Sequence, residues 1–326
     1  MIRGLDTNGP GSGANIGATQ TPSDTPKRDI CFPSDLPSGE SIIFKDSSFF
    51  RRNGSTSVLP SPSDILAEAH RRGVVNEHNP PPIHYPLLGL TIKYGRTVSI
   101  TEGQCLWALR RLPGNIVPAP EVYGWETEGG FSYIYMEHIP GVPLSDRWDS
   151  LSETDKRSIC CQLRGIVARF RAIQPDGERF IGSVTRQALL DVAFTDSASP
   201  PVGPFPSVAS FHDLFVKLPR PHKCDPNDPP HPFRGNLPDE VPIVFTHGDL
   251  HRSNVIISSP EEGGRPFVKS IIDWGQAGWY PSYWEYCKAR WTADWTEEWV
   301  TIFIPLFLDS FDCYKYWDYF LLSMGV

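Results

Sequence analysis

The stretch from residue 242 to residue 273 constrains the fold of this chain more than any other part of it. Three short apolar runs follow one another there, and each is about as long as one strand. A tight polar loop after His247 separates the first run from the second, and turn residues between Ser259 and Gly264 separate the second from the third. The pattern predicts a strand, a loop and a β-hairpin, with polar side chains only where strands begin or end.

Three polar residues stand at those strand ends: Asp249 after the first run, Asn254 before the second and Asp273 after the third. The layout predicts two carboxylates and one carboxamide on one rim of a small sheet. Phosphoryl transfer uses such a set, because one carboxylate orients the attacking hydroxyl and accepts its proton while an Asn and a second Asp hold Mg²⁺. Each residue alone is typical of an ordinary loop. Their combination with His247 favours an active site.

A family resemblance is carried by the same residues, since 247–255 read HGDLHRSNV and 272–274 read IDW. These motifs resemble the phosphotransfer signature of the aminoglycoside phosphotransferase and choline kinase family, a relative of the protein kinases. The resemblance covers most of residues 86–300. It implies a two-lobed protein-kinase-like α+β fold, with a small antiparallel-sheet N-lobe and a mainly helical C-lobe, and it implies ATP and Mg²⁺ as cofactors. The roles it implies are catalysis by Asp249, metal binding by Asn254 and Asp273, and support of the loop by His247.

The expected nucleotide-binding lysine is Lys93, near the end of a strand predicted over residues 88–95. Family members use a lysine at this point to contact the nucleotide phosphates. Ser99 then opens a pattern typical of a helix through Arg111. Glu102 on this helix has two interpretations. It caps its own helix, or it orients Lys93 as the paired glutamate does in kinases, and the order of strand and helix favours the second.

Residues 137–142 follow two predicted strands and contain a proline and a glycine, as a connector between lobes should. The resemblance implies that the main chain of Glu137 and Ile139 contacts adenine here. A glycine-rich loop over the phosphates, which protein kinases have, is missing before Lys93. The only candidate for it is the weak match at residues 52–56.

The domain organisation follows from these assignments: a disordered tail at 1–40, an N-lobe at 41–136, the hinge, and a C-lobe at 143–326. The remaining patterns predict a strand over 41–50, a helix over 62–71, a long helix opened by Ser152 and a short helix near 211–218. The Pro-rich segment 194–240 is either a lid or substrate wall, or an excursion without a role.

Aromatic residues dominate the chain after Asp273. Trp291, Trp295 and Trp299 recur every four residues, which predicts one helical face. Such a face is usually core, although with nearby acidic groups it could hold an ammonium group by cation–π contact. The candidate substrate wall consists of Trp279, Tyr280, Trp284 and Glu285.

The composition limits the partners and the compartment. A formal net charge of −8 argues against nucleic acid or an acidic membrane surface and is compatible with a cationic small-molecule substrate. The seven cysteines show no zinc spacing, and the first thirty residues hold no apolar core of a signal peptide. We therefore expect reduced thiols and a cytoplasmic protein.

The sequence thus predicts an ATP- and Mg²⁺-dependent phosphotransferase that acts on a hydroxyl group of an amine-bearing or hydroxylated metabolite. His251 stands where protein kinases have a lysine, which counts against a protein substrate. Metal binding by His247 and His251 has little support, because an i, i+4 spacing on a loop carries little information. Two alternatives remain: a non-catalytic binding protein that keeps the fold, and a kinase-fold enzyme with other chemistry.

Overall fold

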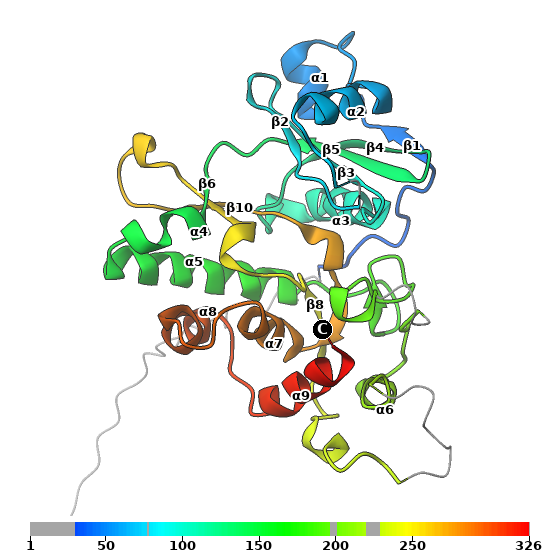
Figure 1. Ribbon diagram of the computed structural model, residues 1–326, viewed down its shortest axis with the longest axis vertical. Helices are drawn as coiled ribbons and strands as arrows, with labels where there is room; N and C mark the ends of the chain where they lie inside the picture. The colour runs from blue at the N-terminus through cyan, green and yellow to red at the C-terminus, as the bar shows by residue number, and fades with distance from the viewer. Residues whose placement is uncertain (1–29, 77, 196–200, 220–228, 326) are drawn as a thin grey trace, which may run out of the picture.

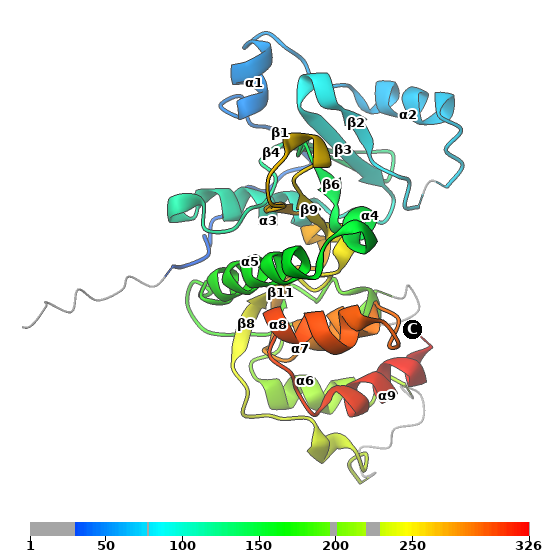
Figure 2. The ribbon, with the colours of Figure 1, turned by 90° about the vertical axis from the view of Figure 1, so that its left-hand side faces the viewer.

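The computed structural model describes residues 30–76, 78–195, 201–219 and 229–325. A small lobe that contains a sheet lies at the top of Figure 1, and a mainly helical lobe lies below it. In the turned view of Figure 2, helix α5 (Glu153–Arg171) runs across the molecule between the small lobe and the lower helices. The predicted two-lobed, kinase-like α+β fold is confirmed.

The N-lobe is built on a five-stranded antiparallel sheet with the strand order β1-β4-β5-β3-β2. On β3, Ile92 and Tyr94 pack beneath α1 and α2, so Lys93 between them points to the opposite face, toward the C-lobe. The elements of this lobe are β1 (Ser41–Ile43), α1 (Ser48–Asn53), α2 (Pro62–Arg71), β2 (Ile83–Tyr85), β3 (Leu90–Gly95), α3 (Ile100–Arg111), β4 (Val122–Glu128) and β5 (Phe131–Glu137).

The C-lobe carries two small three-stranded sheets, with the orders β10-β9-β6 and β7-β11-β8, on a helical body. Its strands are β6 (Val142–Pro143), β7 (Gly182–Ser183), β8 (Ile243–Thr246), β9 (Val255–Ile257), β10 (Val268–Ile271) and β11 (Gly278–Pro281). Its helices, besides α5, are α4 (Leu144–Arg147), α6 (Val208–Phe215), α7 (Trp284–Trp291), α8 (Ile304–Phe307) and α9 (Tyr314–Met324). No helix in the described part of the chain is long and apolar enough to span a bilayer.

Two of the short helical turns of the described chain lie at candidate site residues. The short turns are η1 (Pro86–Leu88), η2 (Pro113–Asn115), η3 (Trp148–Ser150), η4 (Val192–Phe194), η5 (Arg234–Asn236), η6 (Arg252–Asn254), η7 (Pro260–Glu262), η8 (Trp274–Gln276) and the π-helical turn η9 (Trp299–Phe303). The motif of residues 247–255 includes η6, and the chain after Asp273 enters η8.

Residues 30–40 join the two lobes along a path separate from the hinge. Phe32 is 3% exposed in the core of the C-lobe, whereas the carbonyl oxygen of Gly39 accepts a hydrogen bond of 3.0 Å from Nε1 of Trp125 in the N-lobe. In Figure 1 this segment descends on the right, and the link from β5 to β6 descends on the left. The predicted disorder is therefore wrong for 30–40, and residues 1–29 lie outside the described residues.

Several predicted elements are found with their expected bounds. Helix α2 covers the predicted residues 62–71, and its cap Ser61 exchanges hydrogen bonds with Asp64. Helix α5 follows Ser152 and buries the predicted apolar stripe. The strand predicted over 41–50 is wrong in its second half, because β1 ends at Ile43 and α1 follows. The short helix α6 begins a few residues before the predicted one.

The predicted tryptophan face does not exist. Helix α7 ends at Trp291, and the chain turns before a new helical segment starts at Trp299. Asp294 stabilises this turn, since its Oδ1 accepts hydrogen bonds from the N–H and the hydroxyl of Thr296 at 2.9 and 2.7 Å. As a result Trp295 is 78% exposed while Trp299 is buried. The three rings cannot form one cage.

Candidate active site

The β9–β10 hairpin places Asn254 and Asp273 at the same end of one small sheet. Val255 pairs with Ile271, and the N–H of Ile272 donates a 2.9 Å hydrogen bond to the carbonyl oxygen of Asn254. Asn254 therefore enters β9 where β10 is about to end in Asp273. The convergence predicted from the three apolar runs is present in the structure.

His247 fixes the catalytic loop to this hairpin. Its Nδ1 accepts the N–H of Asp249 at 3.1 Å, and its Nε2 donates to the carbonyl oxygen of Ile272 at 2.9 Å. The ring is buried, and both nitrogens are in use. This geometry suits the support role expected for His247 and leaves no nitrogen for metal binding together with His251.

Asp249 faces a ring of polar groups from its own loop. Nδ2 of Asn254 donates to the carbonyl oxygen and to Oδ2 of Asp249, at 2.8 and 3.1 Å. Nε2 of His251 lies 3.5 Å from the same Oδ2. Burial alone would raise the pKa of Asp249, but His251 and the other nearby positive groups outweigh it and lower that pKa. Asp249 is therefore an ionised carboxylate at neutral pH.

Lys93 bridges the lobes through two carboxylates. Its Nζ lies 2.7 Å from Oε2 of Glu102 and 2.6 Å from Oδ1 of Asp273. Burial acts to lower the pKa of Lys93, but the two carboxylates raise it above its ordinary value. Burial raises the pKa of Glu102, and Lys93 opposes that effect. The expected Lys93–Glu102 pair is present. The side chain of Glu102 is thus paired with Lys93, and the side chain of Ser99 caps the helix by accepting a hydrogen bond from the N–H of Thr101.

Asp273 and Asn254 fit a magnesium ion by the chemistry of their free oxygens. Asp273 adopts a left-handed backbone with φ 63°, and its side chain is 40% exposed. Among the described residues, its Oδ2 and the Oδ1 of Asn254 have no hydrogen-bond partner. No group of three His, Cys, Asp or Glu side chains in the described ranges could hold a metal. Two oxygen ligands, completed by water and phosphate oxygens, are the usual protein share of a Mg²⁺ site.

The hinge leaves one backbone donor free where adenine is expected. The N–H of Glu137 donates to the carbonyl oxygen of Glu121 at 2.8 Å, and that of His138 donates to Gly89 at 3.1 Å. Within the described chain the N–H of Ile139 has no acceptor. The hinge can therefore offer Ile139 N–H to a ligand.

The candidate phosphate-covering loop at 52–56 lies on the wrong side of the sheet. Gly54 caps helix α1, and Nδ2 of Asn53 donates to the carbonyl oxygen of Leu88 at 3.1 Å. Helix α1 packs on the face of the sheet opposite Lys93. This weak candidate for a glycine-rich loop therefore does not face Lys93. Among the described residues, β2 is the strand at the edge of the sheet, next to β3, which carries Lys93.

Three of the four candidate substrate-wall residues are sealed in the core. Tyr280, Trp284 and Glu285 have no exposed surface, so the prediction that they contact substrate is wrong. Glu285 makes a different set of contacts, which the sequence did not predict. Its Oε2 accepts the N–H of His247 at 2.7 Å and that of Gly248 at 3.4 Å. Helix α7 thereby holds the start of the catalytic loop.

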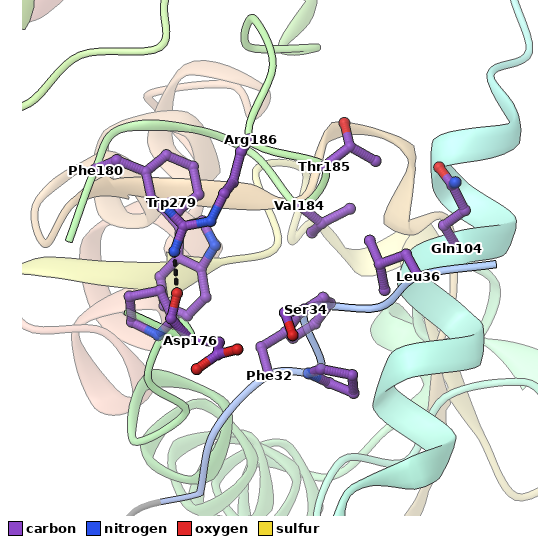
Figure 3. Close-up of a pocket in the computed structure, with 12 residues that line it drawn as sticks. Phe32, Ser34, Leu36, Gln104, Asp176, Phe180, Val184, Thr185, Arg186 and Trp279 are labelled. Carbon is purple, nitrogen blue, oxygen red and sulfur yellow. Dashed lines mark hydrogen bonds between the residues drawn. The ribbon is translucent and has the colours of Figure 1, made fainter. Parts of the chain in front are cut away.

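Trp279 lines a hollow of about 240 Å³, which Figure 3 shows between residues 32–36, α3 and the loop 175–186. Phe32 and Phe180 form its aromatic sides, and Gln104 lies at the α3 side. On α3, residues two apart lie on opposite sides, so Gln104 faces away from the side that carries Glu102 to Lys93. The hollow is thus separate from the active-site rim.

A buried polar network beside the catalytic loop was also not predicted. Nζ of Lys288 lies 2.8 Å from Oδ1 of Asp191 and 3.1 Å from Oε1 of Gln276. Asp191 and Lys288 are fully buried and stand 97 residues apart in sequence. No local pattern marks such a pair, and only the short distance of Gln276 from Asp273 could have suggested that it lies near the site.

The model of the APH phosphotransferase enzyme family matches residues 101–318. No curated protein matches the chain. The solved structures that it resembles include the aminoglycoside phosphotransferase APH(4)-Ia in a ternary complex with ADP and hygromycin B, with 13% identity over 72% of this chain and 71% of that one and a TM-score of 0.41. A streptomycin-ATP-APH(2")-IIa ternary complex is 11% identical over 71% of this chain and 76% of that one, with a TM-score of 0.38. Since the family model spans more than half of the chain, this protein belongs to the APH phosphotransferase enzyme family.

Proposed function

We propose that this protein is a small-molecule kinase that transfers the γ-phosphoryl group of ATP to a hydroxyl group, with Mg²⁺ as the metal. The observation that carries the proposal is the meeting of Asp249, Asn254 and Asp273 at one end of the β9–β10 hairpin, with Lys93 reaching Asp273 from the other lobe. Phosphoryl transfer depends on positioning and charge stabilisation, and these residues supply both.

Asp249 orients the acceptor hydroxyl and takes its proton as the new P–O bond forms and the bond from the γ-phosphorus to the bridging oxygen breaks, so that ADP leaves. The lowered pKa of Asp249 keeps it ionised, so it is ready to accept a hydrogen bond from the hydroxyl. Asn254 holds it in place through its Nδ2. His247 keeps the loop on the hairpin.

Asn254 and Asp273 would hold Mg²⁺, which when bound supplies positive charge to the phosphate oxygens. Lys93 binds the phosphates, and the buried Glu102 keeps its ammonium group in place. Around Lys93 and the hairpin end, the carboxylates of Asp249, Asp273 and Glu102 lie near the ammonium group of Lys93. This excess of negative charge favours a divalent cation.

The nucleotide base would lie at the hinge, where the N–H of Ile139 is free and the carbonyl group of Glu137 is the expected acceptor. For the acceptor we propose an amine-bearing or hydroxylated metabolite, in accord with the net charge of −8. The hygromycin B and streptomycin complexes named above are consistent with an acceptor of this kind.

A non-catalytic, nucleotide-binding role is the second candidate. It is favoured by one observation: the candidate phosphate-covering loop lies on the far side of the sheet. Because backbone N–H groups of such a loop contribute to phosphate binding, its displacement would weaken binding and transfer alike.

The test is incubation with Mg²⁺, [γ-³²P]ATP and a panel of aminocyclitols, sugars, amino alcohols and hydroxy amino acids. We expect a phosphorylated product from the unmodified protein and none from Asp249→Ala. Asp149→Ala, at an exposed position, serves as the matched control and should stay active. Nucleotide binding without product from any acceptor would favour the second candidate. Turnover of an acceptor without ATP would show that the cleft performs other chemistry.

A further inference from the structure

The mechanism above makes no use of the buried pair of Asp191 and Lys288, although this pair is fully desolvated. Oδ1 of Asp191 accepts from Nζ of Lys288 at 2.8 Å and from the N–H of Ala193 at 2.9 Å. Its Oδ2 accepts from Nε1 of Trp284 at 2.8 Å. Buried ion pairs add little stability compared with apolar packing, and this pair also holds a neighbouring group in place.

That neighbouring group is the side-chain amide of Gln276. Its Oε1 accepts from Nζ of Lys288 and from the N–H of Val192, each at 3.1 Å. An ammonium group and a backbone N–H can only donate, so the oxygen of the amide must face them. The NH₂ end must then point the other way. Among the described residues Nε2 of Gln276 has no acceptor, and the side chain is partly exposed.

Gln276 lies directly against the catalytic loop. A Cβ atom placed on Gly248 would come 2.9 Å from the carbonyl oxygen of Gln276 and 3.2 Å from its Cβ. Gly248 is the residue before Asp249 and has φ +82°. The charge of Lys288 is also among those that act on Asp249. The network therefore leaves the two N–H donors of the Gln276 amide without an acceptor among the described residues, on a residue whose main chain lies against the residue before Asp249.

We propose that Nε2 of Gln276 donates a hydrogen bond to a second oxygen of the acceptor, next to the hydroxyl that is phosphorylated, and that Asp191 and Lys288 are positioning residues for this amide. The inference rests on the proposed function and narrows its acceptor class. An amide NH₂ binds a hydroxyl, ether or carbonyl oxygen and rejects an ammonium group at the same point. The acceptor thus carries a second oxygen next to the reacting hydroxyl, and any amine that it carries lies elsewhere on it.

The test pairs a protein variant with an acceptor analogue in a double-mutant cycle. The acceptor is the best substrate from the panel, and the analogues are its mono-deoxy derivatives. We compare Gln276→Leu with Gln187→Leu, which removes an amide at an exposed position distant in sequence from the catalytic loop. The loss of one neutral hydrogen bond corresponds to a roughly 3- to 10-fold rise in KM for the acceptor. KM for ATP should stay unchanged in Gln276→Leu, and Gln187→Leu should behave as the unmodified protein.

The cycle identifies the contact. For the unmodified protein, one mono-deoxy analogue should have a higher KM than the parent acceptor. For Gln276→Leu, the KM values of that analogue and of the parent should agree within about a factor of two, because the hydrogen bond is already gone. Gln276→Glu should still phosphorylate the acceptor with a free second hydroxyl, because that hydroxyl can donate a hydrogen bond to the carboxylate. It should lose activity on the corresponding methyl ether, which has no hydrogen to donate.

If the effect of Gln276→Leu on KM for the acceptor is the same for the parent acceptor and for every mono-deoxy analogue, the inference is overturned and the kinase proposal stands. An equal rise of KM for ATP and for the acceptor would also overturn it. Failure of the unmodified protein to phosphorylate any acceptor would overturn the proposed function, and the inference with it.

Discussion

Replacement of Lys288 by Met should destabilise the protein severely, because it leaves the carboxylate of Asp191 buried without its counter-ion. Both side chains of the pair have no exposed surface. Removal of one partner of such a pair costs about 3–5 kcal/mol of unfolding free energy. The double variant Asp191→Asn/Lys288→Met removes both charges, keeps the side-chain volumes similar, and should cost less than the single variant, at about 2 kcal/mol or below.

The surface pair of Arg164 and Asp309 provides the matched control. Its two charged groups lie 3.2 Å apart, but the side chains are 55% and 66% exposed. Arg164→Met should therefore cost less than about 1 kcal/mol. Urea unfolding is followed by tryptophan fluorescence and by far-UV circular dichroism, and the free energies are compared only where the two transitions coincide. With an m-value above about 3 kcal/mol per M for a chain of this size, Lys288→Met should shift the midpoint by roughly 1 M.

Two results would refute this reasoning. One is a shift for Lys288→Met that is no larger than the shift for Arg164→Met. The other is a double variant that is less stable than the single variant, since the unpaired charge of Asp191 would then not be the source of the loss.

Three further predictions concern the loop, the histidines and the N-terminal segment. Gly248→Ala should abolish transfer and cost at least about 1–2 kcal/mol, because its φ is +82° and the new Cβ meets Gln276, whereas Gly235→Ala, in open space, should be neutral in the same urea assay. Burial lowers the pKa of His212, so the unfolded chain binds a proton more readily than the folded one, and stability should fall as the pH drops below about 6.5. His212→Gln should therefore reduce the difference between the urea midpoints at about pH 7.5 and about pH 5.5. An unchanged difference would contradict this reasoning. Phe32→Ala should cost about 3–5 kcal/mol in thermal or urea unfolding, which a structureless segment would not.

The parts of the fold that follow local rules could be predicted from the sequence. Helix α2 starts at a capping box, and the strands around Asp249 are apolar runs bounded by turn residues, so their positions were evident. The tryptophan spacing failed because four residues is one helical turn only if the helix continues. The Asp294–Thr296 contact ends that continuity, and an Asp two residues before a Thr was the available signal.

The parts that depend on contacts between distant residues could not be predicted. Nothing in the sequence near Asp191 indicates that it meets Lys288, and nothing near Phe32 indicates that it enters the core of the other lobe. The composition of residues 1–40 predicts disorder, because composition gives the amount of apolar surface but not whether a single ring such as Phe32 packs into a core. The same limit applies to the buried aromatic residues after Asp273, whose composition suits a substrate wall and a core equally well.

The path of residues 30–40 has a consequence for how the cleft can open. Two lobes connected only at a hinge can separate widely by rotation about it. Here a second segment of the chain, residues 30–40, connects the lobes on the opposite side of the molecule. A wider opening would have to pull Phe32 away from Phe245, whose ring centroid lies 5.4 Å from its own. In the proposed function, a residue far from the hinge would therefore limit how far the lobes separate when nucleotide is exchanged.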